Sequence, residues 1–145
     1  MSHSFRNTVE VIMFSQGKLL VVKRSSKAKI APSCWHVPAG KAKYDETPEQ
    51  AAIREVLEET NIQLTHVEPL FVRPFQGTTV DGERYYRCIF TYAAHVTHTS
   101  MLQLNDEHSD YAWVTLQQLA APQYASFDQQ LYQIIADNMK KARAN

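Results

Sequence analysis

Three carboxylates in the middle of the chain have the types and spacing of metal ligands. Glu55, Glu58 and Glu59 follow Arg54 at helical spacing, and we call these three glutamates the acidic cluster. Residues three or four positions apart share one face of a helix, where like charges repel one another. A hard divalent cation removes that repulsion, because carboxylate oxygens are ligands that Mg²⁺ and Mn²⁺ prefer. The cluster therefore indicates a metal site, although such a run by itself would also suit a solvated acidic helix face.

The segment around the acidic cluster carries signals for the start and the end of a helix. Thr47 is a suitable N-cap, Pro48 suits the first helical position, and Gln50 completes a Thr-x-x-Gln capping box. Asn61 tolerates the left-handed conformation that closes many helices. We expect a helix between these caps, with the acidic cluster facing away from the core.

Strand signals lie on both sides of this helix. Apolar runs at 9–14 and 18–23 enclose a Ser-Gln-Gly turn and predict a β-hairpin. Further strands are expected at 35–37, in one or two pieces within 62–76, at 83–96 and at 111–114. A second helix is expected at 126–144, where Ser126 and Gln129 would form a capping box. This order predicts an α/β (α+β) fold in which a mixed sheet packs between helices.

Composition limits the classes of partner. The chain has 145 residues, of which 44% are hydrophobic and 21% charged, and its formal net charge is zero. We expect a single domain, 1–145, without affinity for duplex nucleic acid or a membrane, because a neutral chain creates no global field toward either. No apolar stretch reaches the length of a membrane-spanning helix. Cys34 and Cys88 are interpreted as reduced thiols, which predicts a cytoplasmic protein, and the formation of a homodimer stays open.

The residues from Gly40 to Ile62 resemble the Nudix box. The motif here is Gly40, five residues, Glu46, seven residues and then R-E-V-L-E-E-T-N-I. One position departs from the family pattern, since Asn61 stands where the family has Gly, and both residues can adopt the helix-ending backbone. The flanking runs L-L-V-V-K-R, W-H-V-P-A-G and D-Y-A-W-V also look like strands of the family. The resemblance therefore spans most of the chain and implies a Nudix α/β/α sandwich.

The resemblance also implies an activity, because Nudix enzymes hydrolyse a nucleoside diphosphate linked to another group X. It implies that Glu55, Glu58 and Glu59 bind Mg²⁺, with Mn²⁺ as the alternative and the Gly40 carbonyl as a further ligand. Such a metal neutralises the phosphates and lowers the pKa of bound water, and a carboxylate then accepts a proton.

Arg54 would hold the box glutamates in position, and Glu46 would join that network. Glu107 resembles the late glutamate of MutT-type members, so Glu107 and Glu58 are both candidates for the base. For Glu107, a solvated loop carboxylate is the alternative.

Contacts to the substrate leave a weaker signal in the sequence. Arg24 begins a basic loop that could contact phosphates. Trp35, Phe75 and Tyr86 could stack on a base, although each is more often a packing residue. The short chain favours MutT-like cleavage of a (d)NTP to a nucleoside monophosphate and pyrophosphate. The alternatives are a hydrolase of a nucleotide sugar, ADP-ribose or a dinucleoside polyphosphate, and a non-catalytic module that senses a nucleotide.

Overall fold

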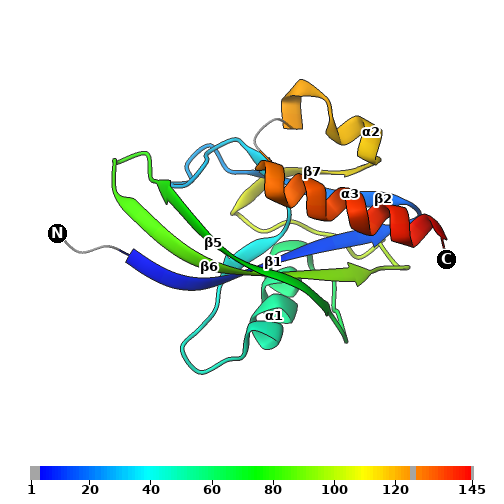
Figure 1. Cartoon of the computed structure of the whole chain (residues 1–145), viewed down its shortest axis with the longest axis horizontal. Coiled ribbons are helices and arrows are strands. Elements are labelled where there is room, and N and C mark those ends of the chain that lie inside the picture. The colour runs from blue at the N-terminus through cyan, green and yellow to red at the C-terminus, as the bar shows by residue number, and fades with distance from the viewer. Residues whose placement is uncertain (1–3, 125–126, 145) are drawn as a thin grey trace.

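A seven-stranded mixed sheet forms the centre of the computed structural model, which describes residues 4–124 and 127–144 (Figure 1). The strands are β1 (Ser4–Ser15), β2 (Lys18–Arg24), β3 (Trp35–His36), β4 (Ala39–Lys41), β5 (Glu68–Thr78), β6 (Arg84–His95) and β7 (His108–Val114). The helices are α1 (Pro48–Thr60), α2 (Leu116–Leu119) and α3 (Gln129–Ala144), with a 3₁₀ turn at Pro122–Tyr124. The predicted mixed sheet between helices is confirmed. In the described residues, no helix combines the length and apolar character needed to cross a membrane.

Strand β1 joins the two halves of the sheet. It pairs in parallel with β6, from Ser4 opposite Tyr85 to Phe14 opposite His95, and antiparallel with β2 and β4. Strand β5 pairs antiparallel with β6, and β2 pairs antiparallel with both β3 and β7. Because Gly40 of β4 lies opposite Val9, the chain that leads into α1 is fixed to the middle of the sheet.

Helices α1 and α3 cover opposite faces of the sheet (Figure 1). The core under α1 includes Val9, Val11, Ala52, Val56 and Ile62. The core under α3 includes Ile12, Phe14, Leu131, Ile135 and Met139. Successive residues of a strand point to opposite faces, so β1 supplies both cores. The helix expected near the end of the chain thus packs against the sheet through Leu131, Ile135 and Met139.

Several element boundaries differ from the sequence prediction, and β1, for example, begins at Ser4 and not at 9. Strand β5 begins at Glu68 and not near 62, because Ile62, Leu64 and Val67 are buried under the sheet as part of a connecting segment. Apolar residues in a buried connection resemble a strand in sequence. Strand β7 begins at His108, three residues before the predicted start at 111.

The start of α3 is organised by Asp128. Its carboxylate Oδ1 accepts a hydrogen bond from the Leu131 N–H at 2.8 Å, and its carbonyl accepts one from the Tyr132 N–H at 3.0 Å. The predicted capping box depended on Ser126, which lies outside the described residues. Among the described residues, Asp128 therefore provides the cap, because its side chain satisfies an N–H that has no partner within the helix.

The loop between β2 and β3 connects two parts of the molecule. The Val80 N–H, in the turn between β5 and β6, donates to the Lys29 carbonyl at 3.0 Å. The Ser25 N–H donates to the Glu107 carbonyl at 2.9 Å. Ala31 has a φ of 44°, in the left-handed region that residues other than glycine seldom adopt. The loop is thus held from both ends and lies beside the β5–β6 hairpin (Figure 1).

Candidate active site

Helix α1 is capped at both ends, as the sequence predicts. Thr47 Oγ1 accepts from the Gln50 N–H at 3.1 Å, and Gln50 Oε1 accepts from the Thr47 N–H at 2.9 Å. At the other end, Asn61 has φ 62° and ψ 17°, and its N–H donates to the Leu57 carbonyl. The departure from glycine at this position is therefore accommodated in the left-handed conformation.

Arg54 lies at the centre of a network of carboxylates. Its guanidinium contacts Glu46 Oε1 at 2.5 Å, Glu55 Oε1 at 2.9 Å and Glu58 Oε2 at 3.1 Å. It also donates to the Lys41 carbonyl at 3.0 Å. The hydrogen bonds from Arg54 hold the pKa of Glu46 at about 2. The structure thus joins Arg54 and Glu46 to the acidic cluster and restricts where its side chains can lie.

Gly40 lies directly against the Glu55 carboxylate. A Cβ atom at this position would overlap the carboxylate carbon and both of its oxygens. Glycine therefore permits a close approach between backbone and carboxylate that any side chain would prevent. Burial raises the pKa of Glu55, against the opposing effect of Arg54.

The expectation that the acidic cluster faces away from the core is wrong for Glu59, which is 0% exposed. Glu59 follows Val56 by three positions and Ala52 by seven, which places it on the apolar stripe of α1. Its Oε1 accepts from the Ala39 N–H at 3.4 Å, while Oε2 is buried without a hydrogen-bond partner among the described residues. Burial raises the pKa of Glu59 well above its usual value, and neighbouring Glu55 adds to the rise.

The last loop residue before β7 and the first residue of that strand bring two further groups to Glu59. Three possible ligand atoms lie within 4.8 Å of one another, one each from Glu59, Glu107 and His108. His108 Nε2 lies 3.4 Å from Glu59 Oε1 and 3.1 Å from His36 Nε2. Desolvation, followed by the charge of Arg24, lowers the pKa of His108 to about 4, so the ring is neutral at pH 7. The sequence analysis gave His108 no role at the site, and its adjacency to Glu107 was the available signal.

A cleft of about 510 Å³ opens beside these carboxylates. It is lined by Arg24, Ser25, Lys27, Ala28, Ala39, Gly40, Lys41, Glu55, Asp106 and Glu107. Arg24 is ordered there, since its Nε donates to the Ile30 carbonyl at 2.6 Å. Of the residues expected to act, the structure therefore brings Gly40, Glu55 and Glu107 to one cleft with Arg24. Glu58 lies outward, with its side chain 50% exposed and paired to Arg54.

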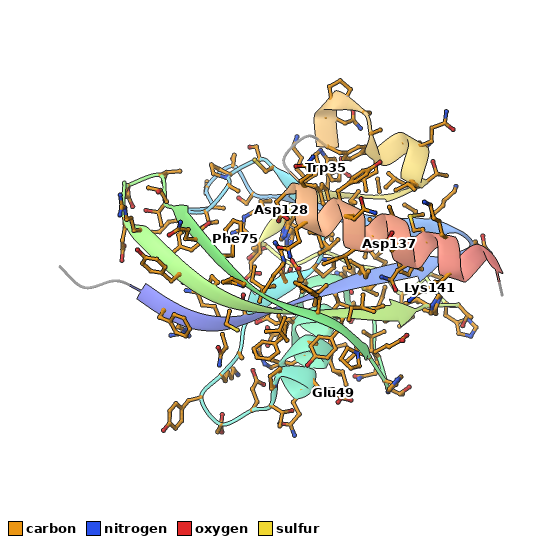
Figure 2. All side chains as sticks on the ribbon, in the orientation of Figure 1. Trp35, Glu49, Phe75, Asp128, Asp137 and Lys141 are labelled. Atoms are coloured by element: carbon orange, nitrogen blue, oxygen red, sulfur yellow. The ribbon has the colours of Figure 1, made fainter. Side chains whose placement is uncertain are left out.

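The three aromatic residues expected to contact substrate lie in different surroundings. The Trp35 ring packs edge-on against Tyr124 at 5.4 Å, beside the core under α3. Phe75 lies 6.2 Å from the Tyr85 ring, on the face of the hairpin toward Asp128 and the start of α3 (Figure 2). Tyr86 follows Tyr85 along β6, so its side chain points to the opposite face. Phe75 and Tyr86 both line a separate hollow of about 340 Å³, and neither residue lines the cleft beside the carboxylates.

A family model described as the NUDIX domain matches residues 4–135. This match covers most of the chain, and the motif, the fold and the carboxylate site agree with it. The chain therefore belongs to the Nudix hydrolase family, which confirms the prediction from the Gly40–Ile62 motif.

Individual relatives differ in their described activities. The chain is 34% identical over 118 residues to an isopentenyl-diphosphate Delta-isomerase of Citrobacter koseri, covering 77% of this chain and 64% of that protein. It is 31% identical over 113 residues to the phosphatase NudJ of Escherichia coli strain K12, covering 77% and 69%. A solved MutT NUDIX hydrolase from Burkholderia pseudomallei superimposes with a TM-score of 0.68 at 27% identity, covering 83% of this chain and 90% of that one. The chain thus spans less than two thirds of the isomerase relative and somewhat more of the phosphatase.

Proposed function

We propose that this protein is a metal-dependent hydrolase that cleaves a phosphoric anhydride bond in a nucleoside diphosphate derivative. The first choice of substrate is a (d)NTP, which would give a nucleoside monophosphate and pyrophosphate. The observation that carries the proposal is the meeting of Glu55, Glu59 and Glu107 beside the Gly40 backbone. Family membership supports the same class of reaction.

The donor set fits a hard divalent cation such as Mg²⁺ or Mn²⁺. Glu59 Oε2 is buried and lacks a partner among the described residues, and a cation would supply one. Glu55 offers further carboxylate oxygens, and the Gly40 carbonyl offers a neutral one. When bound, the metal supplies charge neutralisation for the phosphates and lowers the pKa of a bound water. His108, a nitrogen donor next to Glu59, favours Mn²⁺ as a second ion to test.

Side chains of the protein would position the carboxylates, accept the proton and bind the phosphates. Arg54 fixes Glu55 by a direct ion pair and so holds that carboxylate toward the cleft. Glu107, which lines the cleft, is better placed than Glu58 to accept a proton from the attacking water, because Glu58 is paired outward with Arg54. Arg24, also in the cleft, would contact the phosphates and stabilise charge on the leaving group.

The test is a substrate panel at millimolar Mg²⁺ or Mn²⁺ with products identified by ³¹P NMR. We expect a (d)NTP to yield nucleoside monophosphate and pyrophosphate, whereas a preferred nucleotide sugar would yield a sugar phosphate instead. The panel includes isopentenyl diphosphate, because one relative is an isomerase. Isomerisation of that compound without cleavage of any nucleotide would overturn the proposal. Tight nucleotide binding without turnover would favour the sensing module.

A further inference from the structure

A β-bulge lies directly beside His108, the first residue of β7. Lys23 of β2 lies opposite Asp110 of β7, yet the next residue of β2, Arg24, lies opposite His108. Ser109 is therefore an extra residue on β7, which is what defines a bulge. A bulge re-aims the side chains next to it, because it interrupts the alternation of successive residues between the two faces of the sheet.

This bulge turns the His108 side chain toward α1. Trp113 of β7 packs against the core under α1, and simple alternation from Trp113 would direct His108 to the opposite face, which α3 covers. Because His108 lies opposite Arg24, it shares the face of Arg24, and Arg24 is two positions from Val22 of the core under α1. Glu59 belongs to α1, so the bulge accounts for the contact between a residue of β7 and a carboxylate of that helix.

His108 and Glu59 form an enclosed pair of one imidazole nitrogen and one carboxylate. Their exposed fractions are 6% and 0%, and His108 Nε2 lies 3.4 Å from Glu59 Oε1. Metal–ligand bonds of about 2.0–2.2 Å place neighbouring ligand atoms of one divalent cation roughly 3–3.5 Å apart. The separation of the two atoms is within this range, and Glu59 Oε2 is buried without a hydrogen-bond partner among the described residues. The pair therefore has the spacing of two ligands to one cation.

His36 contacts the same nitrogen from the other side of β2. It is paired with Val22, which puts its ring on the α1 face, and its Nε2 lies 3.1 Å from His108 Nε2. Two neutral imidazoles make such a contact when one donates its N–H to the bare nitrogen of the other. A cation that binds His108 Nε2 would take the place of His36 in this contact, and Glu107 would remain the proton acceptor.

We propose that His108 is a nitrogen ligand of the metal site, and that it gives the site a preference for borderline transition cations such as Zn²⁺ and Co²⁺ over Mg²⁺. Imidazole nitrogen suits such cations, whereas Mg²⁺ prefers carboxylate, carbonyl and water oxygens. The motif glutamates and the Gly40 carbonyl alone would form a site of oxygen ligands only, so the preference comes from one residue outside the motif. The role of the ion in catalysis rests on the proposed hydrolase function, whereas the nitrogen ligation does not.

Calorimetric titration of the metal-free protein with Co²⁺ or with Mg²⁺, without nucleotide, tests the preference. We expect His108→Gln to weaken Co²⁺ binding by about tenfold or more, because a nitrogen ligand is lost, and Mg²⁺ binding by less than about threefold. His98→Gln removes an exposed histidine and should leave both affinities unchanged. Equal losses for the two ions, or an unchanged affinity for Co²⁺, would overturn the proposal.

A second measurement needs no variant to fold. In wild-type protein labelled with ¹⁵N-histidine, electron spin-echo modulation of bound Mn²⁺ should show a directly bound nitrogen, and His108→Gln should abolish that signal. Bound Mn²⁺ without nitrogen coupling in the wild type, or coupling that persists in His108→Gln, would overturn the proposal even in an active hydrolase. Nitrogen coupling that depends on His108, in a protein that cleaves no diphosphate compound, would sink the proposed function but leave the nitrogen ligand standing.

Discussion

The two candidates for the general base, Glu107 and Glu58, lie in different environments. Glu107 belongs to the group of ligand atoms around Glu59, whereas Glu58 pairs with Arg54 on the outer side of α1. A proton acceptor has to reach the attacking water, which places it on the cleft side. Glu107 is thus far from the acidic cluster in the sequence, yet the fold brings it beside Glu59.

We expect Glu107→Gln to lower kcat by about a hundredfold, within the range for loss of a general base, and to remove the acidic limb of the pH–rate profile. Steady-state rates from pH 5 to 9 measure both effects. Glu58→Gln is the companion variant and should lose less, since its side chain is half-exposed. A Glu107→Gln profile with the wild-type shape would return the role of base to Glu58.

The two histidines near Glu59 predict an acid-sensitive fold. Desolvation lowers the pKa of both His36 and His108 below the usual value of 6.5, to about 4 for His108. The unfolded chain therefore binds more protons than the folded one between pH 6.5 and 4, and stability is lost as the pH falls through that window.

Urea unfolding in EDTA at a series of pH values tests this linkage. In the wild type, the unfolding free energy should fall between neutral and acid pH. In His108→Gln, we expect this fall to be smaller by about 2 kcal/mol. His98→Gln changes an exposed histidine and serves as the control. Parallel stability curves for wild type and His108→Gln would show that His108 contributes nothing to the acid sensitivity.

At the scale of elements, an ion network fastens α3 to the sheet. Arg73 of β5 is 3% exposed and contacts Glu10 of β1 at 3.1 Å and both carboxylate oxygens of Asp128 at 3.0 Å. Thr91 of β6 donates to Glu10 at 2.7 Å. The network thus joins three strands to the residue that caps α3. Buried charges of this kind contribute mainly when all partners are present.

Arg73→Met should therefore cost more stability than a replacement of the whole network. We expect the single variant to lose about 3–5 kcal/mol of unfolding free energy, because it leaves buried Glu10 without its cation. The combined variant Glu10→Leu, Arg73→Met and Asp128→Asn should recover most of that loss, and its Asn keeps a suitable cap for α3. Chemical unfolding monitored by circular dichroism compares them. A combined variant no more stable than Arg73→Met would contradict this account.

At the scale of the whole molecule, metal binding and folding should be coupled through Glu59. A cation that binds only the folded state raises its stability by mass action, by about 2.7 kcal/mol at a hundredfold excess over Kd. We expect millimolar Mn²⁺ or Mg²⁺ to raise the Tm of the wild type and to raise that of Glu59→Gln much less. Glu59→Gln should also lose about a hundredfold or more in rate, given the several kcal/mol that such a metal supplies. Equal metal-induced shifts in both proteins would remove Glu59 from the metal site.

Local signals in the sequence predicted most of the elements, but not strand β4 (Ala39–Lys41), the true start of β5 or the assembly of the sheet. The caps at Thr47 and Asn61 were predictable because each involves residues a few positions apart. The burial of Glu59 was visible in its helical spacing from Val56, yet repulsion among like charges suggested an exposed face. The pairing of Arg6 with Arg87 joins distant positions through a parallel register that no local pattern encodes. Contacts between such distant residues could therefore be recognised only in the folded structure.

The loop between β2 and β3 has a mechanical consequence. Lys29 ties it to the tip of the β5–β6 hairpin, and Ser25 ties it to the carbonyl of Glu107. The four intervening steps of chain form a short link between the hairpin tip and the segment that carries Glu107. A ligand that pushes the hairpin tip outward, with both hydrogen bonds intact, has to pull on the segment that carries Glu107. A displacement of the hairpin tip would then be transmitted along the loop to Glu107 at the cleft.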